Sequence, residues 1–184
     1  MNSKHSNIFE LIEKIYLSFS SAKEILLDHS LKVLNKSLQI VESHPELTVD
    51  LNLIEEGALV HDIGMIKTLA PDIFCYGDKP YICHGVEGAH ILIQNGFSYL
   101  AGFAENHVGS GILVDEIEKH GLPLPKRDMV PVSVEEEIVC FADKFYSKGK
   151  RSSSEKTLEE IKSDMFKFGE APYNRFLLLA KKLG

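Results

Sequence analysis

Apolar residues recur at helical spacing along almost the whole chain, and this periodicity constrains the fold more than any other feature. Three stretches open with an S/T-x-x-E signal, at Ser21, Ser133 and Thr157, which has the form of a helix capping box. They predict helices over about 21–43, 133–149 and 157–169. Further helices are predicted at about 6–18, 51–63, 85–95, 98–107, 114–120 and 173–183. The predicted fold class is therefore all-α.

No convincing pair of strands accompanies these helices. Residues 130–134 form the only β-rich stretch, and Pro131 argues against a central strand there. Residues 64–83 and 121–133 carry several Gly and Pro and are predicted loops. The 184 residues are the length of one domain. We predict a single domain over 1–184, with a core at about 22–150 and a helical pair at about 155–184.

Charge and cysteine content narrow the class of protein. The net charge of −7 argues against a protein that coats nucleic acid, although a site holding metal ions makes its own positive field for a phosphorylated substrate. Three cysteines without a C-x-x-C pair indicate reduced thiols. No signal-peptide core and no run of about 18 apolar residues is present. We expect a cytoplasmic protein without a membrane span, and the sequence leaves a homo-oligomer open.

Several histidines and aspartates fall on inward helix faces or at helix ends. His29, for example, lies three residues after Leu26 and four before Val33. Burial of an ionised aspartate costs several kcal/mol or more unless it is paired, and no clearly inward Lys or Arg stands beside these positions. A divalent cation such as Fe, Mn, Zn, Co or Ni suits imidazole and carboxylate together. A metal-free network of His–Asp hydrogen bonds is the alternative. The predicted metal ligands are His29, His61, Asp62, His84, His107 and Asp143.

The other four histidines carry no such signal, since they lie near the N-terminus, at helix ends or beside polar residues. We expect surface positions for His5, His44, His90 and His120.

The order of these residues resembles the H…HD…D signature of the HD superfamily of metal-dependent phosphohydrolases. HDIG at 61–64 matches the HDIG subgroup. His84 and His107 fall where the two-metal branches, such as HD-GYP phosphodiesterases and HD-type diadenosine tetraphosphate hydrolases, place two further histidines. HGVEGA at 84–89, NHVGSGI at 106–112 and GLPLPKRDMVP at 121–131 are similar to small stand-alone HDIG proteins known as predicted hydrolases. The resemblance covers roughly residues 25–150.

The resemblance implies a helical bundle with the metals between its helices. His29, His61, Asp62 and Asp143 would bind one ion, and Asp62 would bridge to a second ion held by His84 and His107. His61 and Asp62 would then be the catalytic residues. The implied activity is hydrolysis of a phosphoester or phosphoanhydride bond, by water activated between two ions, in a nucleotide or related small phosphate.

The sequence departs from the HD-GYP pattern, because the GYP motif is absent and Met65 stands where those enzymes place a lysine. Cyclic-di-GMP is therefore not the expected substrate. The predicted phosphate-binding residues are Lys67, Lys126, Arg127 and Lys144, with Lys148, Lys150 and Arg151 as further candidates.

Two other function classes stay open at this point. Some HD branches use the same ligands in a di-iron oxygenase, and an HD module without catalysis would bind a nucleotide or a partner.

Overall fold

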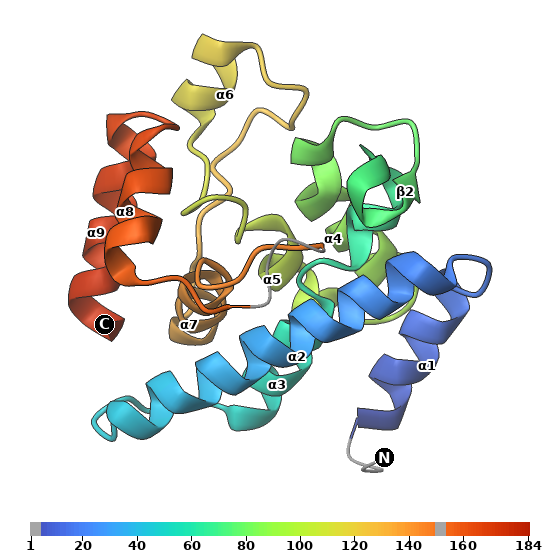
Figure 1. Cartoon of the computed structure of the whole chain (residues 1–184), viewed down its shortest axis with the longest axis horizontal. Coiled ribbons are helices and arrows are strands. Elements are labelled where there is room, and N and C mark those ends of the chain that lie inside the picture. Colours follow the sequence, from blue (N-terminus) through green and yellow to red (C-terminus); the bar gives the residue numbers. More distant parts are fainter. Residues whose placement is uncertain (1–4, 150–153) are drawn as a thin grey trace.

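The computed structural model describes residues 5–149 and 154–184, and Figure 1 shows that their regular secondary structure is almost entirely helical. The all-α prediction is therefore confirmed. The α-helices are α1 (Ser6–Ile15), α2 (Ser20–Ser43), α3 (Leu51–Val60), α4 (His84–Gln94), α5 (Ala101–Glu105), α6 (Val114–His120), α7 (Val134–Asp143), α8 (Leu158–Phe166) and α9 (Glu170–Leu183). Short 3₁₀ turns are η2 (Ile63–Lys67), η3 (Pro71–Ile73), η4 (Tyr81–Cys83) and η5 (Ser98–Leu100).

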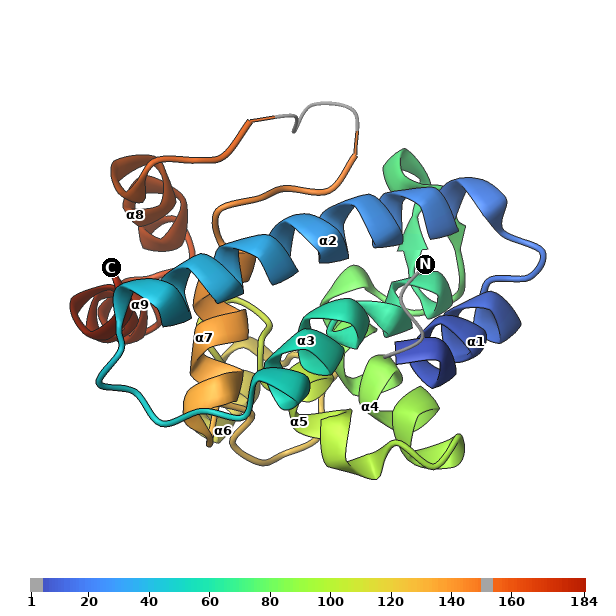
Figure 2. The same ribbon diagram turned by 90° about the horizontal axis from the view of Figure 1, so that it is seen from below.

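The long helix α2 organises the core. It runs across the molecule from α1 to the C-terminal helices (Figure 2), and it packs against α3 and α7. Leu26 and Val33 on its inward face are fully buried, as the helical spacing requires. Helix α4 packs against α5 and η2 on the other side of the core. None of the helices in the described ranges is both long and apolar enough to span a bilayer.

Two of the three predicted helix caps form. The Thr157 hydroxyl accepts a bond from the Glu160 amide (3.3 Å), and the Glu160 carboxylate accepts one from the Thr157 amide (2.8 Å), which completes a capping box. The Ser133 hydroxyl accepts from the Glu136 amide (3.1 Å). The cap predicted at Ser21 is wrong, because α2 begins one residue earlier, and Ser21 lies inside the first turn. A tight turn after α1, in which the Phe19 amide bonds the Tyr16 carbonyl (2.9 Å), brings the chain into helix sooner.

The segment 64–83 is more regular than predicted. It contains a small antiparallel pair, β1 (Leu69–Ala70) and β2 (Cys75–Tyr76), joined through η3 and a left-handed residue at Phe74 (φ 58°). Two-residue strands are too short to show alternation, so the sequence carries no readable signal for them. The predicted helices 51–63 and 98–107 are also shortened, since each gives way to a 3₁₀ turn. All three cysteines are free, as expected.

The C-terminal helices pack onto the rest of the bundle. Helices α8 and α9 lie against each other, and α9 contacts α7. The rings of Phe141 on α7 and Phe176 on α9 lie 5.7 Å apart, centroid to centroid, and both side chains are buried. This shared core supports the single domain over 1–184 that we propose.

The HDIG turn is held by two close contacts. The buried hydroxyl of Tyr16 donates to the Ile63 carbonyl (2.9 Å), which ties α1 to η2. Gly64 lies against the start of α4, where a Cβ would be 2.1 Å from both the His84 carbonyl oxygen and the Gly88 nitrogen. The glycine of HDIG is therefore required for the approach of α4 to η2.

We expect Gly64→Ala to lower the free energy of unfolding by about 1–3 kcal/mol, because backbone atoms must move apart to admit the methyl group. Urea denaturation followed by circular dichroism measures this change. Lys67→Ala, at an exposed position of the same turn, should stay within about 0.5 kcal/mol of the parent. A Gly64→Ala variant as stable as the parent would contradict this account of the turn.

Candidate metal centre

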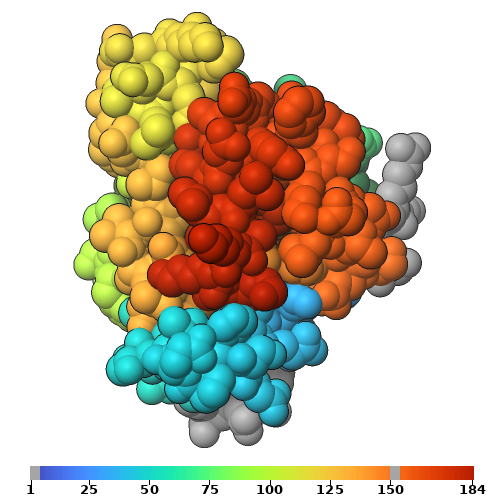
Figure 3. All heavy atoms as spheres, turned by 90° about the vertical axis from the view of Figure 1, so that its left-hand side faces the viewer, coloured from blue at the N-terminus to red at the C-terminus, as the bar shows by residue number. Residues whose placement is uncertain are grey.

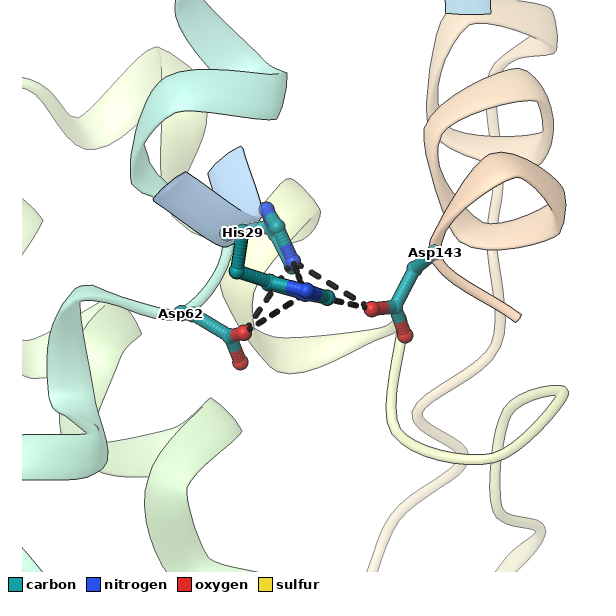
Figure 4. Close-up of side chains that lie close together, drawn as sticks. His29, Asp62 and Asp143 are labelled. Atoms are coloured by element: carbon teal, nitrogen blue, oxygen red, sulfur yellow. Dashed lines mark hydrogen bonds and ion pairs between the residues drawn. The ribbon is translucent and has the colours of Figure 1, made fainter. Parts of the chain in front are cut away.

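Five segments of the fold bring the predicted ligands to one buried place. Three of these side chains are labelled in Figure 4, where Asp62 and Asp143 approach His29 from opposite sides. All six are buried, with 0–7% of each residue exposed. Their positions are the middle of α2 (His29), the two residues between α3 and η2 (His61 and Asp62), the first residue of α4 (His84), the second residue after α5 (His107) and the last residue of α7 (Asp143).

Four of these side chains form the first group, which could hold one metal ion. His29 Nε2 lies 2.9 Å from Asp143 Oδ1 and 3.2 Å from Asp62 Oδ2. His61 Nε2 lies 3.2 Å from the same Asp62 oxygen and 3.5 Å from Asp143 Oδ1. Two ligands bound to one ion at about 2.1 Å lie roughly 3–3.5 Å apart. The spacing therefore fits a single shared ion.

Asp62 also belongs to a second group with His84 and His107, which could likewise hold an ion. Its other oxygen, Oδ1, lies 3.4 Å from His84 Nε2 and 3.3 Å from His107 Nε2. Neither carboxylate oxygen of Asp62 makes a hydrogen bond of ordinary geometry within the described residues. One oxygen thus faces each group, as a carboxylate between two ions would require.

The histidine rings are held so that the same nitrogen faces inward. His61, His84 and His107 each donate from Nδ1 to a backbone carbonyl three residues earlier, at 2.7–2.8 Å. In the neutral imidazole, this bond leaves a lone pair on Nε2. The Nε2 atoms of His84 and His107 are only 3.1 Å apart. Two such lone pairs repel unless a cation lies between them, so the donor set fits a divalent metal.

Two lysines beside the carboxylates correct the sequence analysis, which expected no inward cation there. Lys148 Nζ lies 2.8 Å from Asp62 Oδ2, and Lys144 Nζ lies 2.6 Å from Asp143 Oδ2. Lys144 also donates to the His107 carbonyl (3.0 Å). The helix predicted over 133–149 is wrong beyond Asp143, because α7 ends there. Both lysines lie in the turn that follows, where helical spacing no longer places a side chain. The two lysines neutralise the charge of the two carboxylates. Neither of them lies between the Nε2 atoms of His84 and His107, which face each other.

The two groups differ in their electrostatics. Burial alone would lower the pKa of His61, but the Asp62 carboxylate, with help from Asp143, raises it to about 9. Burial lowers the pKa of His84 to about 3, because the attraction of Asp62 is too weak to compensate. Burial opposes ionisation of Asp62, yet Lys148 and His61 hold the pKa of this carboxyl well below its usual range. The first group thus pairs two ionised carboxylates with a positively charged His61, whose proton a metal ion would displace, whereas the second group offers neutral imidazoles.

The remaining predicted phosphate-binding residues lie away from the cluster. Lys67 is exposed, Lys126 is exposed and paired with Glu118 (3.2 Å), and Arg127 is exposed and paired with Glu105. Their role stays a prediction, and Lys150 and Arg151 fall outside the described residues. Of the four histidines expected at the surface, His90 and His120 are exposed and His5 and His44 are half-buried.

A cavity of about 630 Å³ opens from the second group. His84, His107 and Asp143 line it at one end, together with Lys144 and Lys148. Its size is typical of a small-molecule site.

Tyr81 is another residue of this cavity that sequence reasoning missed. Its ring stacks on His84 with centroids 4.6 Å apart, and Lys148 Nζ lies 6.0 Å above it. Its place three residues before a predicted ligand was the available signal.

The sequence comparison now identifies the family. A model of the HD domain matches residues 26–147, which include all six buried histidines and aspartates. The chain belongs to the HD domain family. The match ends four residues after Asp143, so α8 and α9 of this HD protein lie beyond it.

Relatives of this HD protein occur in archaea. It is 38% identical over 120 residues to an uncharacterised protein of Methanocaldococcus jannaschii, a match covering 65% of this chain and 63% of that protein. It is also 32% and 30% identical to tRNA (cytidine(56)-2′-O)-methyltransferases of Picrophilus torridus and Thermoplasma volcanium, over 71% and 77% of this chain. The matches span only 34% and 37% of these longer proteins.

Solved structures share the fold. The HD domain of the phosphodiesterase PgpH of L. monocytogenes superposes with a TM-score of 0.53 at 19% identity, over 94% of each chain. The same domain in complex with cyclic-di-AMP gives the same TM-score and identity, over 95% of this chain and 93% of that one.

We expect the protein, purified without chelators, to carry about two divalent ions per chain and the double variant His84→Ala/His107→Ala to carry about one. Elemental analysis measures both. The double variant His90→Ala/His120→Ala, which removes two exposed histidines, should keep the parent's content. One ion in both parent and variant would limit the centre to the first group, and none after reloading with Mn or Fe would contradict a metal centre.

Proposed function

We propose that this HD protein is a metal-dependent phosphohydrolase that cleaves a phosphoester or phosphoanhydride bond in a nucleotide or a related small phosphate. One observation carries the proposal: the buried Asp62 presents one oxygen to each of two ligand groups, with His29, His61 and Asp143 on one side and two histidines on the other. When bound, two divalent ions supply hydroxide near neutral pH and positive charge for phosphoryl oxygens.

The chain's own residues orient this site. In the proposal, His29, His61, Asp62 and Asp143 hold one ion, and Asp62, His84 and His107 hold the other. The backbone carbonyls that bind the Nδ1 atoms fix three of the four imidazoles, so that the ligands need little rearrangement. Asp62 and His61 are the residues that we place closest to the reaction.

Lys148 and Lys144 are the residues that we propose for the phosphate. Their ammonium groups lie on Asp62 and Asp143 and line the cavity. Ions that neutralise the two carboxylates would leave these ammonium groups free to bind phosphate oxygens. Such charge-assisted hydrogen bonds are worth about 1.5–3 kcal/mol each.

The comparisons agree with a phosphate compound as substrate. The structural neighbour PgpH is a phosphodiesterase whose HD domain was crystallised with cyclic-di-AMP. The methyltransferase relatives match this chain over about a third of their length, and we propose no methyl transfer for it.

We expect the Mn-loaded parent to release phosphate or a nucleotide from at least one member of a panel of nucleoside phosphates, cyclic dinucleotides and pyrophosphate. Asp62→Asn should lower kcat by at least about 100-fold, because the neutral amide no longer provides two anionic ligand atoms. Asp78→Asn, whose carboxylate is 87% exposed, is the matched control and should keep the parent's kcat.

The outcome of the same panel separates the alternatives. Nucleotide binding that is unchanged in Asp62→Asn, without turnover in the parent, would favour a non-catalytic binding module. Turnover that requires oxygen and a mixed-valent iron pair would favour the di-iron oxygenase.

Removal of the Lys148 ammonium should raise KM about 10-fold with little change in metal content, because one charge-assisted bond to phosphate is lost. Lys148→Met keeps the apolar stem for this test, and steady-state kinetics on the best panel substrate measures it. Lys181→Ala, at an exposed position of α9, serves as control. An unchanged KM in Lys148→Met would remove this residue from the substrate site.

A further inference from the structure

The cavity has two chemically different ends. Its inner end carries the second histidine group, Asp143 and the two lysines. Its outer wall is formed by Ile161 and Met165 of α8 and by Phe168 in the turn that follows; we call these three residues the α8 face. Ile112 and Leu122 belong to the same lining. A ligand that fills the cavity therefore meets the metal ligands and two lysines on one side and the apolar side chains of α8 on another.

Phe168 is the least covered part of the α8 face. Ile161 and Met165 are 2% and 4% exposed, whereas Phe168 is 73% exposed although it lines the cavity. An exposed phenylalanine ring gains free energy when an apolar group removes it from water. A flat apolar group in the cavity would gain part of this energy by covering the ring, and it would contact Met165 as well.

The α8 face is fixed relative to the metal ligands. The Ser110 hydroxyl donates to the Pro172 carbonyl (2.7 Å), and Arg175 donates to the Gly111 carbonyl (2.8 Å). Arg175 also pairs with Glu116 (2.8 Å). These bonds attach the start of α9 to the loop that follows His107. Figure 3 shows the red and orange atoms of the C-terminal helices across the middle of this side of the molecule, below α6.

The charges near the α8 face favour an anionic ligand. Lys156 and Lys167 both pair with Asp164, at 2.9 Å and 2.6 Å, and all three line the cavity. Two ammonium groups on one carboxylate leave one positive charge in excess beside the α8 face.

We infer that the α8 face receives the base of a nucleoside monophosphate whose phosphate lies at the lysines and the histidine groups. This inference rests on the proposed function and narrows its substrate class to phosphates that carry a flat, largely apolar group. The α8 face lies outside the stretch matched by the HD domain model. Substrate choice would thus depend on α8 and α9, which lie beyond the HD domain match, whereas the metal ligands lie within it.

The test compares two ligands that differ only by the base. We expect Mn-loaded parent protein to bind adenosine 5′-monophosphate at least about 10-fold more tightly than ribose 5-phosphate in calorimetry, because only the former covers Phe168. Phe168→Ala should remove most of this difference and leave the affinity for ribose 5-phosphate and the metal content unchanged. Phe166→Ala is the matched control, since Phe166 is 66% exposed on the same helix and is not among the described residues that line the cavity.

Equal affinities of the parent for the two ligands, no binding of adenosine 5′-monophosphate, or equal losses in Phe168→Ala and Phe166→Ala would each overturn the inference. Phosphate release is assayed in the same samples and across the wider panel. Base-selective binding without any hydrolysis would contradict the proposed function and leave the inference standing. Hydrolysis at equal rates with and without the base would support the proposed function and overturn the inference.

Discussion

The buried carboxylate of Asp62 is the constraint around which the centre of this molecule is arranged. An ionised group without exposure to water costs several kcal/mol or more unless charges or donors surround it. Its neighbours come from four other segments: His29 from α2, His84 from α4, His107 from the loop after α5 and Lys148 from the turn after α7. The close approach of α4 to the HDIG turn at Gly64 also brings a ligand toward Asp62, because α4 begins with His84.

Asp143 presents a related problem at a helix end. It is the last residue of α7, where the helix dipole disfavours a negative charge. Lys144 compensates for this charge, and the imidazole of His29 lies on the other oxygen. The two lysines therefore complete the charge balance of the cluster, and the same two ammonium groups line the cavity. The two lysine side chains are therefore positioned to pair with the carboxylates and also to bind an anionic ligand.

The division of the chain between the HD domain match and the C-terminal helices fits the proposed function. The stretch that belongs to the HD domain family supplies the six buried histidines and aspartates. The residues beyond it form α8 and α9, which close the cavity and are bonded to the loop after His107. A shared centre with a separate wall lets related proteins keep one chemistry while they vary the group that they recognise.

The sequence by itself determined the helical class, the caps at Ser133 and Thr157 and the burial of the six histidines and aspartates, because these depend on local spacing along a helix. Only the tertiary structure decided which lysines reach the cluster and where α8 lies. Lys67 was predicted near the phosphate and is exposed, whereas Lys148 lies on Asp62. The position of a long side chain in a turn depends on how the whole fold places that turn. The neighbouring residues in the sequence therefore do not predict it.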